Sequence, residues 1–477
     1  TGGIPRLSEG LLHEIANLTE WPVAIACTFE REFLDVPPEA LVTTMETNQK
    51  FVPVFDAEGR LTEHFIGVAN IESRDPAEIR KGYERVIRPR FADAKFFWDE
   101  DLKTPLADYQ EGLKNVTYQQ SLGSLWDKTV RVAELARIIA NRVGVDAGQA
   151  THAAALAKCD LLTRMVGEFP ELQGVMGRYY ATRQGIAAEV ADALDSFYQP
   201  RFGGDAIAAG KVGQVLAVAE RLDTLAGIFA VGQKPSGNKD PFALRRAALG
   251  LARTLIEGGL DIDLRATLTE AFELVPEAAL VAGVKPGKDG KAPAVDIGAR
   301  RRELGDEVHA FVLDRLRGYY ADQGYSADQF EAVLAVTPAT LPDFDRRLRA
   351  VGEFARRAEA ASLAAANKRV ANILRKQAEE ANAAPIPGTV DPAHFELDAE
   401  RELHAALDAA RADTRTLLAG GDYTGTLARL SALQAPVDRF FDDVLVNAEN
   451  PAVRANRLAL LAQLKASFGA IADISRL

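Results

Sequence analysis

Apolar side chains recur at helical spacing through most of this sequence, and this pattern restricts its fold more than any other feature. Val132, Leu135, Ile139 and Val143 repeat every three or four residues, and the stretch 215–229 does the same. Such spacing places the apolar groups on one face of an α-helix. From about residue 111 onward, strand signals nearly vanish. The sequence therefore predicts a mainly helical, multidomain protein, and 477 residues suffice for about three domains.

The first 110 residues have a mixed pattern. Ser8 is a candidate N-cap for a helix, and residues 21–29 form an apolar run typical of a buried strand. Two β-rich runs, 50–56 and 63–71, flank a short segment with Gly59, which indicates a hairpin. We therefore expect a small α+β region at the start of the chain.

Two breaks interrupt the later helical pattern. Residues 281–298 are rich in Gly, Pro and Lys and predict a loop. Residues 381–392 form a second break, after which Asp391 and Pro392 are expected to cap a new helix. The Ala-rich stretch 355–382 before this break keeps an apolar stripe and is predicted to be helical.

Composition excludes several classes of protein. The formal net charge of −12 argues against a globally basic nucleic-acid binder, but not against a local basic face. Cys27 and Cys159 are too few for a disulfide framework or a four-cysteine zinc site. No apolar run approaches a membrane span, and no signal peptide is evident. We expect a cytoplasmic chain with no membrane contact, and a start that lies inside a longer protein.

Familiar catalytic motifs are incomplete in this sequence or have a simpler structural explanation. The segment 283–288 approaches a phosphate-binding loop but is one residue short, and Asp289 replaces the Ser or Thr that would hold magnesium. Glu400 and His404 are four residues apart on a predicted helix, where an exposed ion pair is the expected arrangement. The remaining histidines are scattered and are expected to be surface or packing residues. They are His13, His64, His152, His309 and His394.

The stretch 121–230 resembles the layout of an HD-type metal phosphohydrolase. In that family an early helix carries a His, an Ala-rich helix ends in His-Asp, and a late helix carries an Asp; these side chains hold a metal that activates water. The corresponding residues here are Lys128, Cys159, Asp160 and Glu220, and only Asp160 keeps its type. Because a lysine repels a cation, we expect a degenerate HD-like domain without metal or catalytic residues.

Residues 341–378 reverse the charge of the chain locally. Nine basic residues there outnumber four acidic ones. Lys368 and Arg375 lie seven residues apart, as do Arg369 and Lys376, so each pair shares one face of a helix. This surface suits an RNA backbone, but a solvated helix face with local ion pairs explains the charges equally well.

Five long segments carry a further resemblance: 43–55, 67–101, 157–181 (AKCDLLTRMVGEFPELQGVMGRYYA), 237–255 (GNKDPFALRRAALGLARTL) and 440–475. They strongly resemble the β subunit of bacterial heterotetrameric glycyl-tRNA synthetase, and the resemblance runs through essentially the whole chain. The family's β subunit extends further at its N-terminus, so we expect this chain to be truncated there.

The resemblance implies a division of labour. The family is an α2β2 enzyme whose α subunit activates glycine with ATP and magnesium, while the β subunit chiefly binds tRNA-Gly and is needed for aminoacylation. No cofactor is then expected on this chain. In agreement, the sequence shows no class II arginine pair, no Gly-rich ATP motif, and no class I HIGH or KMSKS motif. This chain is thus expected to be the tRNA-binding subunit of a glycine–tRNA ligase.

The resemblance also implies four domains. Residues 1–110 are an α+β region that ends a module similar to the phenylalanyl-tRNA synthetase β subunit, and residues 111–235 are the degenerate HD-like domain. A helical body over 236–340 carries the loop insertion 281–298. Residues 341–477 are a helical anticodon-binding domain similar to that of arginyl-tRNA synthetase.

Basic residues in the last two domains are the candidate tRNA contacts. Arginine suits bidentate contacts with phosphate or guanine, and Asn372 is placed to reach a base edge. Arg245 and Arg246 are equally suited to binding carboxylates between helices. The expected contacts are Arg245, Arg246, Lys368, Arg369, Asn372, Arg375, Lys376, Arg454 and Arg457. Two rival functions stay open: an HD-type phosphohydrolase with unusual ligands, and a scaffold that only docks the α subunit.

Overall fold

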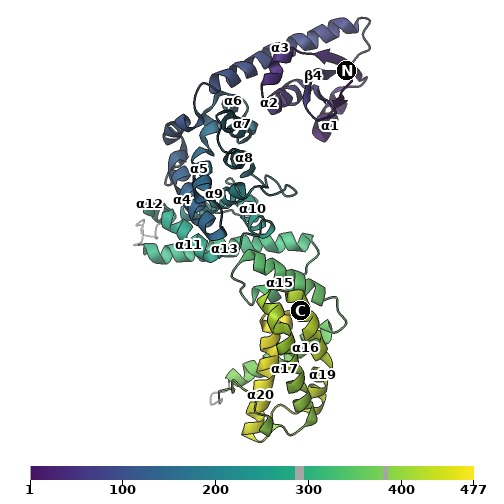
Figure 1. Cartoon of the computed structure of the whole chain (residues 1–477), viewed down its shortest axis with the longest axis vertical. Helices are drawn as coiled ribbons and strands as arrows, with labels where there is room; N and C mark the ends of the chain where they lie inside the picture. The colour runs from purple at the N-terminus through teal and green to yellow at the C-terminus, as the bar shows by residue number, and fades with distance from the viewer. Residues whose placement is uncertain (1, 285–294, 380–384) are drawn as a thin grey trace. The chain divides into compact units, whose positions relative to one another are not determined.

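The chain packs as two compact units, residues 1–223 and 224–477. The computed structural model describes residues 2–284, 295–379 and 385–477. Both units are mainly helical, and the first contains a small antiparallel sheet, as the sequence predicts (Figure 1). Most of the first predicted break, residues 285–294, and the start of the second, residues 381–384, lie outside the described residues, as does residue 380.

The sheet of the first unit has the strand order β1-β3-β4-β2. Its strands are β1 (Ile4–Pro5), β2 (Val23–Thr28), β3 (Val52–Phe55) and β4 (Leu61–Ala69). The predicted strand and hairpin are confirmed: β2 and β3 both pair antiparallel with β4. Gly59 turns the hairpin with φ of +81°, a conformation that favours glycine. Helix α1 (Glu9–Leu18) starts at the predicted N-cap, where the Leu11 N–H donates to the Ser8 hydroxyl.

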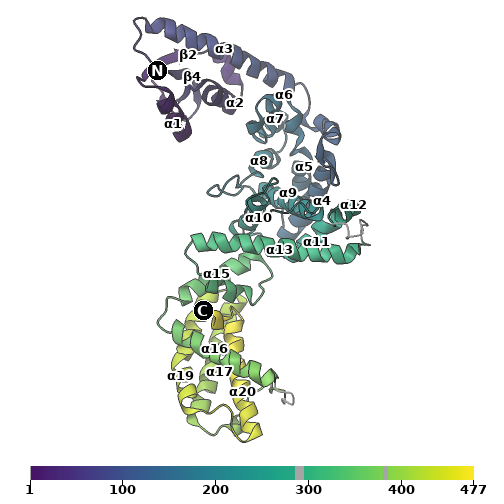
Figure 2. The same ribbon diagram turned by 180° about the vertical axis from the view of Figure 1, so that it is seen from behind.

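Helix α3 (Pro76–Asp101) covers the free edge of β2, and Figure 2 shows it running along the sheet. The Arg80 side chain donates to the Ala26 carbonyl at 2.9 Å, and the Thr28 N–H donates to Glu84 at 2.9 Å. These bonds satisfy edge groups that would otherwise offer a template for pairing with another strand.

Buried Asp101 joins the end of α3 to the helices that follow. Its carboxylate accepts hydrogen bonds from the Arg164 and Met165 N–H groups and from the Tyr180 hydroxyl. The α-helices after α3 in this unit are α4 (Leu125–Val143), α5 (Ala147–Leu156), α6 (Arg164–Glu168), α7 (Val175–Arg183), α8 (Ala188–Ser196) and α9 (Lys211–Ala230), which continues into the second unit. Two short strands, β5 (Thr117–Gln119) and β6 (Gly123–Ser124), precede α4. The early α+β part therefore shares one unit with the helical part.

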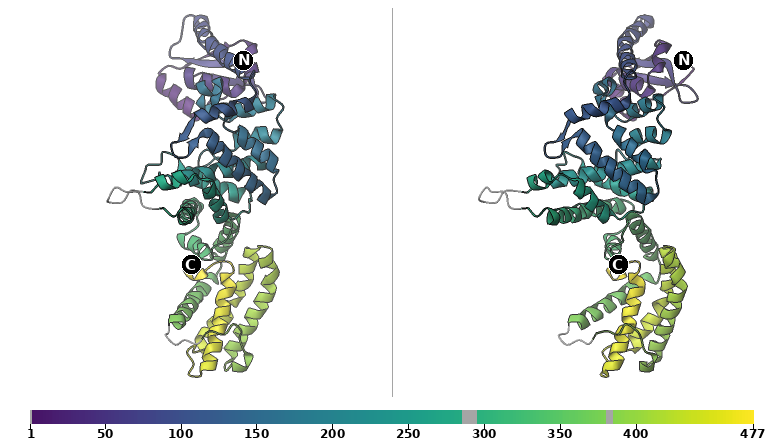
Figure 3. Two further views of the ribbon diagram at one scale, coloured as in Figure 1. Left: turned by 90° about the vertical axis from the view of Figure 1, so that its left-hand side faces the viewer. Right: turned by 60° about the vertical axis from the view of Figure 1, so that its left-hand side comes forward.

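The second unit contains only helices as regular elements among its described residues. They are α10 (Leu244–Glu257), α11 (Leu264–Leu274), α12 (Glu277–Ala282), α13 (Ile297–Asp322), α14 (Ala327–Leu334), α15 (Leu341–Phe354), α16 (Ala360–Glu379), α17 (Asp398–Ala419), α18 (Tyr423–Leu430), α19 (Gln434–Asp443) and α20 (Pro451–Gly469). Helix α13 packs against α10, α11 and α14, while α16 packs against α19 and α20. Figure 3 shows α16, α17, α19 and α20, in green to yellow, running lengthwise in one bundle.

Asp391 and Pro392 cap a new helix, as predicted, and the Asp391 carboxylate accepts the Ala393 N–H. This helix is a single 3-10 turn, Pro392–His394, and α17 starts only at Asp398. Asn456 on α20 bonds both the N–H and the carbonyl of Asp391, at 2.8 and 3.0 Å, and so joins this cap to α20.

Candidate nucleic-acid interface

Helix α16 presents one buried face and one basic face. Leu363 and Val370 are fully buried against the bundle. The exposed residues recur at spacings of three and four, so they form a single stripe along the helix. We call this set the α16 stripe: Lys368, Arg369, Asn372, Arg375 and Lys376. The structure thus brings together five of the nine residues predicted to contact tRNA.

Two arginines of the α16 stripe have local partners. The Arg369 guanidinium lies over the Phe441 ring of α19, 4.3 Å from its centroid, which orients the group without neutralising it. Arg375 forms an exposed ion pair with Glu379 at 3.2 Å, and such pairs contribute little free energy. Both cations therefore stay available to an anionic ligand.

Arg454 and Arg457 on α20 differ from the α16 stripe. Arg454 is half-buried and donates to Gln377 of α16 at 2.8 Å. Arg457 is 4% exposed, pairs with Glu400 at 2.8 Å and donates to the Leu445 carbonyl. The prediction that Arg457 contacts tRNA is therefore wrong, because its guanidinium is buried and bonded to groups inside the bundle.

The predicted exposed pair between Glu400 and His404 is also wrong. Glu400 is fully buried, pairs with Arg457 and accepts hydrogen bonds from the Glu396 and Leu397 N–H groups. His404 pairs instead with Asp408. Burial by itself would raise the pKa of Glu400, but the bonds from Arg457 and from the backbone outweigh it and lower the pKa. This carboxylate stabilises the fold.

Arg245 and Arg246 lie in the first turn of α10. The Arg245 guanidinium is half-buried and donates to the Gly237 carbonyl at 2.6 Å, while Asp240 accepts the Leu244 and Arg245 N–H groups. Arg246 is exposed. Arg245 thus stabilises the loop before α10, and a role of either residue in tRNA contact stays a prediction.

The predicted degenerate HD residues come together from α4, α9 and the turn after α5. The Lys128 ammonium lies 2.9 Å from Asp223 and 3.4 Å from Glu220, and the Lys158 ammonium is also 3.4 Å from Glu220. Arg131 is the third cation of this group and lies 2.5 Å from Asp223. We call Lys128, Arg131, Lys158, Glu220 and Asp223 the buried charge cluster.

The charges of this cluster fix one another. Burial opposes ionisation of Lys128, but Asp223 and Glu220 outweigh it and raise its pKa. Burial likewise opposes ionisation of Glu220, and the two lysines outweigh it and lower its pKa to about 2. The lysine ammonium groups pair with both carboxylates of the cluster and so join α4 to α9. Because both carboxylates are paired, neither is available to hold a metal that activates water.

Cys159 and Asp160 lie directly beside the cluster. Asp160 is buried and accepts the Gly174 and Gly177 N–H groups at 2.6 and 3.1 Å, yet burial raises its pKa to about 6. Burial also raises the pKa of the Cys159 thiol to about 12, so the thiol is protonated near neutral pH. Neither residue is placed as a metal ligand beside the two lysines.

Sequence reasoning missed Arg131, Lys158 and Asp223. A signal was available: Lys128 and Arg131 are three residues apart on an otherwise apolar helix face, as are Glu220 and Asp223. Charged side chains on an apolar helix face are buried only when they are paired, so opposite charges on two such helices indicate a buried ion-pair network. Within the described ranges, no group of three or more His, Cys, Asp or Glu side chains is arranged to hold a metal ion.

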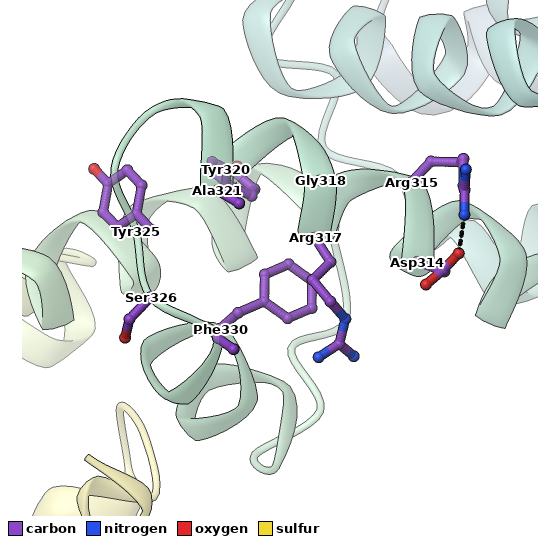
Figure 4. Close-up of a pocket in the computed structure, with 10 residues that line it drawn as sticks. Asp314, Arg315, Arg317, Gly318, Tyr320, Ala321, Tyr325, Ser326 and Phe330 are labelled. Atoms are coloured by element: carbon purple, nitrogen blue, oxygen red, sulfur yellow. Dashed lines mark hydrogen bonds and ion pairs between the residues drawn. The ribbon is translucent and has the colours of Figure 1, made fainter.

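A cavity of about 400 Å³ lies between the end of α13 and α14 (Figure 4). Its floor is aromatic: Tyr320 and Phe330 are buried, and Arg317 lies over the Phe330 ring at 5.1 Å. Arg317 also pairs with Glu331, and Arg315 pairs with Asp314. Since carboxylates neutralise both arginines, the cavity is poorly suited to phosphate.

A second cavity of about 460 Å³ lies beside α11, α13 and α15 and is lined by His309 and Arg265. Burial lowers the pKa of His309 to about 4, so its imidazole is neutral near pH 7. Arg265 pairs with Asp306. As expected from the sequence, His309 is a packing residue at the edge of an apolar hollow.

Comparison with known families identifies the chain. A family model described as "Glycyl-tRNA synthetase beta subunit" matches residues 1–335. The chain belongs to this family. A second model, described as "DALR anticodon binding domain", matches residues 363–474, which include the α16 stripe. The expected family and the helical anticodon-binding domain are thereby confirmed, and the four predicted domain boundaries stay predictions.

Named relatives agree with this assignment. The chain is 55% identical over 476 residues to a glycine–tRNA ligase beta subunit of Xanthomonas campestris pv. campestris (strain B100), covering 100% of this chain and 66% of the relative. It is 50% identical to the corresponding protein of Xylella fastidiosa (strain M12), covering 100% and 67%. For Pseudomonas aeruginosa (strain LESB58) the identity is 47%, covering 98% and 65%. The chain thus spans about two thirds of the length of its curated relatives.

Proposed function

We propose that this chain is the tRNA-binding β subunit of a cytoplasmic glycine–tRNA ligase. It supports the ATP-dependent attachment of glycine to tRNA-Gly, as part of an α2β2 assembly whose α subunit carries out the adenylate chemistry. This chain itself binds no cofactor, and ATP and magnesium act on the α subunit. The observation that carries the proposal is the α16 stripe, an exposed basic surface inside a region that matches an anticodon-binding domain.

The α16 stripe has the chemistry that tRNA binding requires. Its four cations neutralise phosphates and release counterions, which favours binding at low salt. Arg369 is oriented by Phe441, and Asn372 lies between the two basic pairs, within reach of an unstacked base. No helix within the described part of the chain is long and apolar enough to cross a membrane. The phosphohydrolase alternative has no comparable support, because lysines occupy the carboxylates of the buried charge cluster.

The first experiment measures glycine transfer to tRNA-Gly by the purified α subunit, with and without this chain. ATP, magnesium and salt are held constant. We expect strong stimulation by the chain. If the chain neither stimulates transfer nor binds tRNA-Gly, the proposed function is wrong.

The second experiment tests whether tRNA binds at the α16 stripe. The stripe variant carries Lys368→Ala, Arg369→Ala, Arg375→Ala and Lys376→Ala. The matched control removes four exposed cations of the first unit: Arg31→Ala, Lys81→Ala, Lys103→Ala and Lys114→Ala. Each lost phosphate contact lowers the slope of log K against log salt by about 0.7–0.9. We expect the stripe variant to lose about 3 from this slope and at least about tenfold in affinity, while the control changes neither. Equal losses in both variants would contradict the placement.

A further inference from the structure

Three large apolar side chains lie exposed at one end of the small sheet. Leu18, Trp21 and Ile71 are 63%, 63% and 62% exposed, and we call them the Trp21 patch. Val23 of β2 is paired with Ala69 of β4, and the same register carried outward places Trp21 opposite Ile71. Leu18 ends α1 just before this turn. Large apolar side chains exposed together at one end of a sheet are typical of an interaction site.

Hydrogen bonds fix the patch in place. The Asn70 side-chain oxygen accepts the Glu20 and Trp21 N–H groups at 2.8 and 2.7 Å, which joins the turn to the end of β4. The Thr19 hydroxyl donates to the Ile15 carbonyl at the end of α1. A partner therefore meets a tryptophan on a backbone that is already ordered, and tryptophan is enriched among the residues that dominate interface energies.

The charges beside the patch restrict its occupant. Glu20 and Glu72 are the sequence neighbours of Trp21 and Ile71, both are exposed, and neither pairs with a cation among the described residues. Arg74 is the one basic residue between 65 and 79. Two carboxylates repel RNA phosphates, and a twofold contact with a second copy would bring the same carboxylates together. The complementary surface is a protein with an apolar centre and a basic rim.

We infer that the Trp21 patch is where the α subunit docks, through an apolar surface edged by basic side chains. The inference rests on the proposed function, which supplies the α subunit as partner. It assigns subunit docking to the sheet of the first unit, and so separates it from the tRNA-binding α16 stripe of the second unit.

Calorimetric titration with purified α subunit tests the inference. The patch variant carries Leu18→Ser, Trp21→Ser and Ile71→Ser. The control variant removes three other exposed apolar side chains, Phe96→Ser, Phe202→Ser and Leu445→Ser. We expect the patch variant to bind the α subunit at least about 30-fold more weakly, as is typical for loss of a central tryptophan, and the control within about twofold of the unaltered chain. A third variant, Glu20→Lys with Glu72→Lys, is expected to bind several-fold more weakly at low salt and less so at high salt.

Three outcomes would overturn the inference. The first is a patch variant that binds the α subunit as tightly as the unaltered chain does. The second is an unaltered chain that fails to bind the α subunit; tRNA-Gly binding by the same sample then shows whether tRNA recognition survives. The third is a dimer of this chain that the patch variant abolishes, since the occupant would then be a second copy.

Discussion

The buried charge cluster and the α16 stripe are both rich in lysine and arginine, yet they use these residues in opposite ways. In the cluster, three cations face two carboxylates inside the protein, at distances down to 2.5 Å. In the α16 stripe, four cations face solvent, with one exposed ion pair among the described residues. The first arrangement satisfies its charges internally and stabilises the fold, while the second keeps them for a ligand.

The difference is one of partners rather than of residue type. A buried ion that loses its partner leaves an uncompensated charge in a medium of low dielectric constant, which costs several kcal/mol. An exposed cation that loses a neighbour is solvated by water at almost no cost. Mutations in the cluster should therefore change stability, and mutations in the α16 stripe should change tRNA affinity and its salt dependence.

The largest expected effect comes from Lys128→Met. Removing this ammonium leaves Asp223 and Glu220 short of a buried counter-charge, and we expect the free energy of unfolding of the first unit to fall by about 3–5 kcal/mol. Trp21, Trp98 and Trp126 are the three tryptophans of the chain, so tryptophan fluorescence in urea follows the first unit alone. The control Lys81→Met removes an exposed lysine of α3 and should cost less than about 0.5 kcal/mol. Similar losses in the two variants would remove the distinction between the cluster and an exposed ion pair.

A second prediction concerns the pH dependence of Asp160. Its pKa is about 6 in the folded chain and 3.8 ordinarily, so the folded state binds more protons between these values. Stability contributed by protonated Asp160 is present below about pH 4 and is lost as the pH rises through 6. Relative to Asp160→Asn, the native chain should lose about 2.4 kcal/mol between pH 4 and pH 7, measured by urea unfolding at each pH.

The control for this prediction is Asp127→Asn. Asp127 belongs to the capping box of α4, and hydrogen bonds from the Ser124 side chain and backbone lower the pKa of its carboxyl. Its stabilisation is therefore present at neutral pH and is lost as the pH falls, which is the opposite sign. A stability difference between Asp160→Asn and the native chain that does not change with pH would refute the assignment.

The sequence predicted those features that depend on local patterns. The N-cap Ser8, the hairpin at Gly59 and the exposed face of α16 each follow from residues within a few turns of one another, and all three are found. The spacing of seven within each basic pair also predicted correctly that its two residues share one face of the helix. Recognition of the family came from long segments, which short motifs could not have supplied.

The failures have a common physical cause. Arg457 and Glu400 are 57 residues apart in sequence, and Lys128 and Asp223 are 95 apart. A charged residue is exposed or buried according to whether packing brings it an opposite charge, and that partner is distant in sequence. The local pattern around Arg457 therefore resembled that of a surface arginine, and the pair between Glu400 and His404 was predicted for the same reason.

The smallest expected effect concerns the exposed ion pair of the α16 stripe. Glu379→Gln removes the carboxylate that pairs with Arg375, and both side chains are exposed. Stability should change by less than about 0.5 kcal/mol, because exposed pairs contribute little. Affinity for tRNA-Gly should rise about twofold at low salt, since a negative charge beside the α16 stripe is removed, and the gain should fade as salt screens the surface.

Filter binding across a salt series measures the gain in affinity and its salt dependence. Glu402→Gln is the control, because it removes another exposed carboxylate of the same bundle. An equal gain from both variants would mean that tRNA responds to the net charge of the bundle rather than to the α16 stripe.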